Sequence, residues 1–119
     1  TSADFIAQIT ADCLVQINKQ SHVSHDYSGL YHLTPLGRIS WYDFACFLVE
    51  EAQKQNFTLM LNKSKIRPIS SSEYPTLAKR PPFSLLDNSK IQKTFDLKIS
   101  DWKYHAQKLV SELKQKEIA

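Results

Sequence analysis

Apolar residues recur every three or four positions at the beginning of the chain, which is the spacing of one helix face. Thr1 and Ser2 precede this pattern and can cap a helix, and Asp4 falls in the first turn, where the helix dipole favours an acid. The apolar positions of this stripe are Phe5, Ile6, Ile9, Cys13, Leu14 and Ile17. The pattern predicts a first helix that ends near Ile17.

A second helix is predicted after Ser40, because Asp43 follows three residues later in a shorter version of the capping box. Its expected inward residues are Trp41, Phe44, Ala45, Leu48 and Ala52. We interpret Trp41 as a core anchor; the alternative is that its ring is a stacking platform for a ligand.

Two further helices are predicted in the last third of the chain. Asp87 can cap a short helix that carries Ile91 and Phe95, and Ser100 or Asp101 can begin a final helix. The final helix is expected to direct inward Trp102, Ala106, Leu109 and Leu113.

Short strands are predicted between these helices, at 30–33, 58–61 and 66–69. Residues 70–86 hold three prolines and little periodicity, and such a long loop in a small chain is typically functional or a linker. The order of elements predicts an α+β fold, dominated by about four helices with a few short strands, in a single domain over 1–119.

Composition is that of an ordinary globular domain. The chain has 119 residues with 42% hydrophobic and 23% charged residues, and a formal net charge of +3. The longest apolar stretches are too short to span a bilayer, and no signal-peptide pattern begins the chain. Cys13 and Cys46 are far apart and fall on predicted apolar helix faces, which favours buried free thiols in a reducing cytoplasm. The chain begins without Met and directly on a helix signal, from which we expect a piece of a longer protein.

Three segments are more specific than this general pattern. The first joins Gly29-Leu30-Tyr31-His32-Leu33 to the helix start at Ser40-Trp41-Tyr42-Asp43. The second reads Ser72-Glu73-Tyr74-Pro75-Thr76-Leu77-Ala78-Lys79-Arg80-Pro81. The third reads Ser84-Leu85-Leu86-Asp87-Asn88-Ser89-Lys90, with Asp101-Trp102 after it.

In this order, the segments resemble the C-terminal region of the dTDP-4-dehydrorhamnose reductases, which are extended short-chain dehydrogenases/reductases. The resemblance covers essentially the whole chain and implies a substrate-binding domain. It implies a parent oxidoreductase that uses NADPH or NADH to reduce the C4 ketone of dTDP-4-dehydro-L-rhamnose, giving dTDP-L-rhamnose for polysaccharide and O-antigen synthesis.

The resemblance also implies that the catalytic half lies elsewhere. In the family, an N-terminal Rossmann half carries the glycine-rich dinucleotide turn and a catalytic Tyr-x-x-x-Lys pair. This chain has only two glycines, Gly29 and Gly37, eight positions apart, so a Gly-x-Gly-x-x-Gly turn is excluded. We therefore expect no catalytic and no cofactor-binding residues in this chain, and no activity from it alone.

The predicted substrate-binding residues lie in the proline-bounded loop: Arg80, Lys79, Tyr74 and Thr76. A cation held in such a loop can bind a diphosphate. Lys79 stands where the family usually has arginine, which replaces a guanidinium fork by a point charge. The alternatives are that Arg80 pairs with a local carboxylate, Glu73 or Asp87, and that Tyr74 only packs the loop.

Two other patterns have plain structural interpretations. Tyr104 and Lys108 satisfy Tyr-x-x-x-Lys, but two fixed residues match often by chance, and we interpret Tyr104 as a surface residue. His22, His25 and Asp26 are metal-ligand types, but they lie in a polar loop that we interpret as solvated.

The resemblance implies Mg²⁺ bound by acids near a subunit contact, and the acids in comparable places are Asp4 and Glu112. The expected partners are a dTDP-sugar, the missing Rossmann domain and, over the apolar face that its absence exposes, a second copy in a homodimer.

Two other hypotheses stay open. One is a non-catalytic, reductase-like regulatory subunit. The other is a basic nucleic-acid-binding module, against which the apolar placement of the aromatic residues argues. We expect neither nucleic acid nor membrane as a partner.

Overall fold

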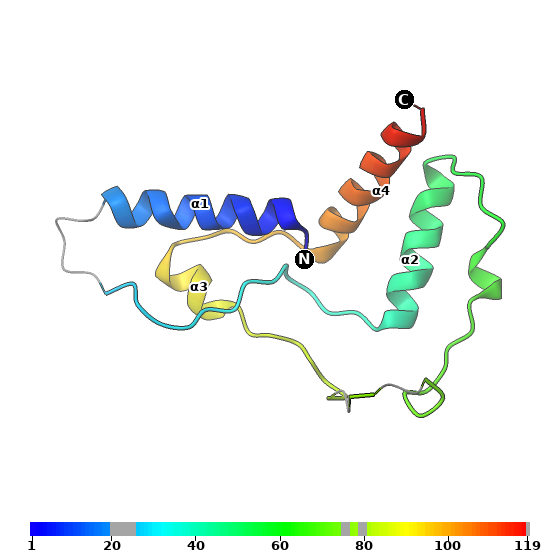
Figure 1. Cartoon of the computed structure of the whole chain (residues 1–119), viewed down its shortest axis with the longest axis horizontal. Coiled ribbons are helices and arrows are strands. Elements are labelled where there is room, and N and C mark those ends of the chain that lie inside the picture. The colour runs from blue at the N-terminus through cyan, green and yellow to red at the C-terminus, as the bar shows by residue number, and fades with distance from the viewer. Residues whose placement is uncertain (20–25, 75–76, 79–80, 119) are drawn as a thin grey trace. The chain divides into compact units, whose positions relative to one another are not determined.

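The computed structural model describes residues 1–19, 26–74, 77–78 and 81–118. Its helices are α1 (Ala3–Lys19), α2 (Trp41–Lys54), the single-turn 3₁₀ helix η1 (Lys63–Lys65), α3 (Ser89–Thr94) and α4 (Trp102–Ile118) (Figure 1). The chain divides into two compact units that interleave along the sequence. Unit 1 consists of Thr1–Leu36 and Leu85–Trp102, and unit 2 of Gly37–Ser84 and Lys103–Ala119.

Side-chain caps fix the beginnings of the first two long helices, as predicted. The backbone N–H of Phe5 donates to Ser2 Oγ at 3.3 Å. In α2, the N–H of Asp43 donates to Ser40 Oγ at 3.0 Å, and that hydroxyl donates to Asp43 Oδ2 at 2.6 Å. These bonds satisfy backbone donors that have no partner within the helix.

The short helix α3 begins one residue later than predicted. Its N-cap residue is Asn88, whereas Asp87 Oδ1 accepts from the N–H of Ser89 at 2.8 Å. The expected side chain therefore supports the helix start from just outside it.

The core of unit 1 contains buried residues from both of the sequence segments that make up the unit. Its buried residues are Phe5 and Ile9 from α1, Ile91 from α3, and Phe95 and Ile99 after α3. The Phe95 ring stacks on Tyr27 with centroids 5.2 Å apart and meets Tyr31 edge-on at 5.5 Å. Figure 1 shows α3 beside α1. Burial of these apolar side chains is the main term that stabilises the unit.

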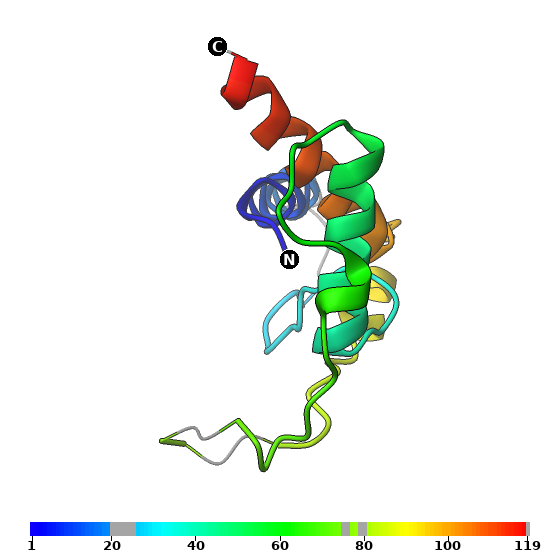
Figure 2. The same cartoon turned by 90° about the vertical axis from the view of Figure 1, so that its right-hand side faces the viewer.

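Unit 2 is built around α2 and the irregular segment that follows it. Residues 57–69, which include η1, run back along the helix (Figure 2), and Lys63 Nζ contacts Glu50 Oε1 at 2.6 Å. From α4, Lys114 Nζ donates to the Asn56 carbonyl at 3.0 Å and lies 4.7 Å from the centre of the Phe57 ring. Polar and cation–ring contacts thus hold the turn after α2.

A buried carboxylate lies on α2. Glu51 is 8% exposed and accepts from the side-chain amides of Gln55 at 3.2 Å and Gln107 at 3.3 Å, with Lys54 Nζ at 3.5 Å. The hydrogen bond from Gln55, then that from Gln107, lowers the pKa of Glu51 below its ordinary value.

We predict that Glu51 makes folding sensitive to acid. Because the pKa of Glu51 is lower in the folded chain, its contribution is complete above the ordinary glutamate pKa and is lost as the pH falls through the lower pKa of the folded chain. Urea unfolding at several pH values should therefore show a smaller acid loss of stability in Glu51→Gln than in the wild type. Glu112→Gln is the control, since its carboxylate pairs only at 3.6 Å with a half-exposed Lys108. Equal acid sensitivity of Glu51→Gln and the wild type would contradict this role.

The helix-dominated fold is confirmed, but the predicted strands are wrong. Over the described residues no strand forms, and the sole β-type pairing is an isolated parallel bridge between Leu36 and Asp101. A strand needs a neighbouring strand to complete its hydrogen bonds. In segment 30–33 side chains supply such contacts instead: Lys90 Nζ donates to the Leu30 carbonyl, and Asn88 Nδ2 donates to the adjacent Thr34 carbonyl.

The predicted inward faces of α2 and α4 are partly wrong. Trp41, expected in the core, is 87% exposed, and Cys46 and Glu51 are the buried residues of α2. On α4, Ala106 is buried as predicted, but Val110 is buried while Leu109 and Leu113 are exposed. The inward face of α4 therefore contains Val110 in place of Leu109, and the exposed residue Gln107 donates a hydrogen bond to Glu51 that the apolar pattern does not contain.

Both cysteines are free thiols, as predicted: Cys46 is buried and Cys13 half-buried. Burial is the main cause that raises the pKa of the Cys13 thiol. Across the described part of the chain, no helix combines the length and apolar character needed to cross a membrane.

Candidate functional site

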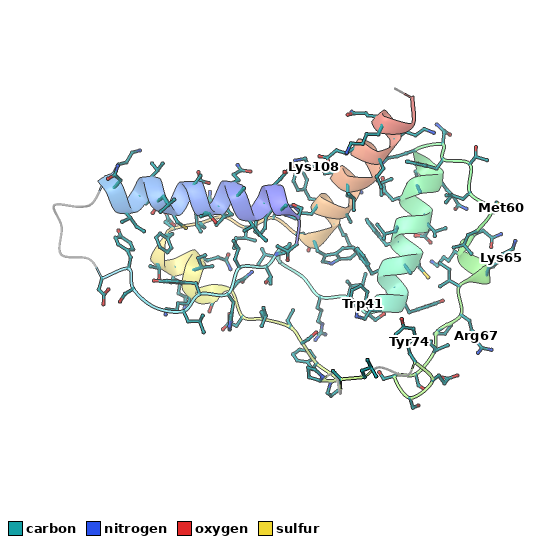
Figure 3. All side chains as sticks on the ribbon, viewed as in Figure 1. Trp41, Met60, Lys65, Arg67, Tyr74 and Lys108 are labelled. Atoms are coloured by element: carbon teal, nitrogen blue, oxygen red, sulfur yellow. The ribbon has the colours of Figure 1, made fainter. Side chains whose placement is uncertain are left out.

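The predicted substrate loop is described only in part. Arg80, Lys79 and Thr76 lie outside the described residues, so their role stays a prediction. Tyr74 is described and its side chain is 66% exposed (Figure 3). An exposed phenol in this loop is available to a ligand.

Glu73 and Asp87, the two carboxylates considered as local partners for Arg80, each have donors of their own. Glu73 Oε2 accepts from the backbone N–H of Ser70 at 2.7 Å and from its hydroxyl at 2.8 Å, and these bonds lower the pKa of Glu73. The N–H of Ser89 likewise lowers the pKa of Asp87. Hydrogen bonds from Ser70 and Ser89 therefore stabilise both charges.

Positive charge is concentrated in segment 57–84 of unit 2. The segment contains five basic residues and one acid, a net charge of +4, while the whole chain carries +3. Lys63 is neutralised by Glu50, whose hydrogen bond is the first cause that raises the pKa of Lys63. Arg67 is exposed and forms no hydrogen bond or ion pair with any other described residue. Arg67 thus adds a cation to this segment that the prediction of site residues missed.

Two of the three specific sequence segments contact each other in unit 1. We call these contacts between residues 29–33 and 87–90 the clamp. Lys90 Nζ donates to the Leu30 carbonyl at 3.0 Å and lies 4.5 Å from the centre of the Tyr31 ring. Gly29 has φ of +129°, and a Cβ built there would lie 2.8 Å from Lys90 Nζ. His32 Nδ1 is 3.3 Å from the Asp87 carbonyl oxygen. These residues pack the two segments against each other, a role that their spacing in the sequence does not indicate.

The residues of this chain do not fit a nicotinamide dinucleotide. A dinucleotide turn needs clustered glycines whose bare backbone approaches the phosphates. The space beside Gly29 is taken by the Lys90 ammonium, and Gly37, with φ of +88°, is the chain's only other glycine.

The predicted metal ligands belong to different units. Asp4 lies in the first turn of α1 in unit 1, and Glu112 lies on α4 in unit 2, with Lys108 Nζ 3.6 Å from its Oε1. No group of three or more His, Cys, Asp or Glu side chains able to hold a metal occurs within the described ranges. His22 and His25 lie outside the described residues, and Asp26 accepts from the N–H of Ser28 at 2.9 Å.

The Tyr-x-x-x-Lys pattern on α4 lies on the surface. Tyr104 is exposed, as predicted, and its ring meets His105 edge-on at 5.3 Å. Lys108 pairs with Glu112 (Figure 3). These contacts are those of an ordinary exposed helix face.

The chain thus consists of two helical units, and unit 2 contains the cation-bearing segment 57–84. Residues 1–115 match the family described as the RmlD substrate binding domain, and the chain belongs to that family.

Individual relatives agree with this assignment. A dTDP-4-dehydrorhamnose reductase of Escherichia coli (strain K12) is 36% identical over 107 residues, which cover 90% of this chain and 35% of that protein. One from Aggregatibacter actinomycetemcomitans is 41% identical over 93 residues, covering 77% and 31%. One from Sinorhizobium fredii is 32% identical over 110 residues, covering 92% and 35%. The chain thus spans about a third of the length of the curated relatives that it matches.

Proposed function

We propose that this chain is the sugar-nucleotide-binding part of a cytoplasmic dTDP-4-dehydrorhamnose reductase. The match of residues 1–115 to a substrate-binding family carries the proposal. The basic segment 57–84 supports it, because a dTDP-sugar has a dianionic diphosphate that converging cations bind.

The proposed reaction of the whole reductase converts the C4 ketone of dTDP-4-dehydro-L-rhamnose to the alcohol of dTDP-L-rhamnose, for which NAD(P)H would be the reductant. A Rossmann domain outside this chain supplies the nicotinamide and the proton-donating tyrosine. This chain contributes one wall of the cleft. Arg80 and Lys79 bind the diphosphate, and Tyr74 and Thr76 line the nucleotide-sugar. By itself the chain is inactive, since a cleft needs both walls.

A chimera tests this function. We would replace the matched 107 residues of the Escherichia coli reductase by this chain and follow NADPH oxidation with dTDP-4-dehydro-L-rhamnose as substrate. The chimera is expected to turn over, and the 119-residue chain alone is expected to give no change in absorbance. An inactive chimera that is folded and binds NADPH would contradict the function, as would turnover by the chain alone.

Arg80→Ala in the chimera is expected to raise KM by about ten- to a hundredfold, because a lost charge-assisted hydrogen bond weakens binding by about 1.5–3 kcal/mol. Lys98→Ala is the matched control, since Lys98 is a basic residue of unit 1, outside segment 57–84. Equal KM values for Arg80→Ala and the unmodified chimera would remove Arg80 from the site.

A further inference from the structure

Trp41 is unusual because a large aromatic side chain lies open to solvent on a well-formed helix. It is the first residue of α2 and is 87% exposed. Its ring meets Phe44 edge-on, with centroids 6.3 Å apart and an interplanar angle of 79°. The contact with Phe44 supports one edge of the indole, while most of its surface can accept another flat group. Figure 3 shows Trp41 at the beginning of α2.

The surroundings of Trp41 favour an uncharged group over an anion. Helix beginnings ordinarily attract phosphate through their free N–H groups. Here Ser40 Oγ already accepts from the N–H of Asp43, and the Asp43 carboxylate lies in the same first turn. A phosphate at this position would be repelled by that carboxylate, whereas an aromatic base carries no charge.

The cations needed for a diphosphate belong to the same unit but to another segment. Arg67 follows η1 in segment 57–84, is exposed, and forms no hydrogen bond or ion pair with another described residue. Unit 2 therefore combines an exposed indole beside an acid with a segment rich in cations. A sugar nucleotide has the same division, a neutral aromatic base joined to a dianionic diphosphate.

We propose that Trp41 is the stacking platform for the nucleobase of the sugar nucleotide and that Arg67 is an additional cation for its diphosphate. This inference rests on the proposed function and adds two binding residues to it. Stacking on an aromatic side chain does not read hydrogen bonds, so Trp41 supplies affinity for a base and leaves the choice of base to other groups.

Fluorescence tests the stack directly, because the chain has only two tryptophans. In a Trp102→Phe background, Trp41 carries the only indole, and excitation at the red edge of the absorption band selects its emission over that of the tyrosines. Titration with dTDP is expected to quench its emission saturably, while inorganic pyrophosphate, which has no base, is expected to leave the emission unchanged.

Calorimetric titration of the 119-residue chain gives the energetic test. Trp41→Leu is expected to weaken dTDP binding by about tenfold while its affinity for pyrophosphate stays the same. Trp102→Phe is the control of the same residue type and should bind dTDP as the wild type does. Trp41→Phe keeps an aromatic face and should retain most of the affinity. Arg67→Ala should weaken dTDP and pyrophosphate alike.

Several results would overturn the stack. These are equal dTDP affinity in Trp41→Leu and the wild type, an equal loss for both probes, or no binding of dTDP by the wild-type chain. Equal dTDP affinity in Trp41→Leu and the wild type would also be expected if Trp41 contacts a protein surface and not a nucleobase. The chimera decides the proposed function separately: turnover with unchanged KM in its Trp41→Leu form would leave that function standing without the stack.

Discussion

Phe95→Ala is expected to destabilise unit 1 by about 3–5 kcal/mol, the usual range for deleting a buried phenylalanine ring. Phe95 is 4% exposed, and its ring contacts both Tyr27 and Tyr31. The substitution removes a packed ring and leaves two tyrosines facing a cavity. Since a typical domain is stable by only about 5–15 kcal/mol, much of the unit's stability should be lost. Urea unfolding followed by circular dichroism measures the change.

Phe83→Ala is the matched control for this substitution. Its ring is 66% exposed, so removing it should change stability by less than about 0.5 kcal/mol. If both variants unfolded at the wild-type urea concentration, Phe95 would not be the centre of the unit 1 core.

Gly29→Ala is expected to destabilise unit 1 by about 1–3 kcal/mol, because φ of +129° is strained for any residue with a Cβ. The new methyl group would also lie 2.8 Å from Lys90 Nζ and displace the ammonium from the Leu30 carbonyl. Thermal unfolding of the variant should show the loss.

Lys90→Met separates these two effects of the Gly29 substitution. It removes the ammonium but leaves the backbone strain at position 29. Gly29→Ala should therefore be less destabilising in the Lys90→Met background than in the wild type, with a coupling within the range of about 0.5–3 kcal/mol for residues in contact. Strict additivity of the two substitutions would show that the clamp does not form.

The helices could be predicted because local signals determine them. Ser2 and Ser40 cap as their sequence positions indicate, and apolar periodicity locates the long helices. Whether strands form could not be predicted from local signals, because an extended segment such as 30–33 becomes a strand only if another strand lies beside it. In this fold its neighbours are the side chains of Lys90 and Asn88, which are distant in sequence.

The substrate-binding roles of the predicted site residues stay predictions. Tyr74 is exposed, and Arg80, Lys79 and Thr76 lie outside the described residues. Trp41 was assigned to the core because its spacing matches the apolar face of α2. Hydrophobicity gives the same signal for a buried anchor and for an aromatic ligand platform, so only the fold distinguishes them.

The interleaving of the units determines when unit 1 can form during synthesis. Gln16 Nε2 donates to the Phe95 carbonyl across 79 positions, and Phe5 and Ile9 share a core with Ile99. The apolar side of α1 therefore leaves the ribosome long before residues 91–99 arrive to cover it. Contacts of such high sequence separation slow folding and leave a nascent chain exposed to aggregation. Among the described helices of this chain, α1 is thus synthesised first but is buried only when residues 91–99 arrive.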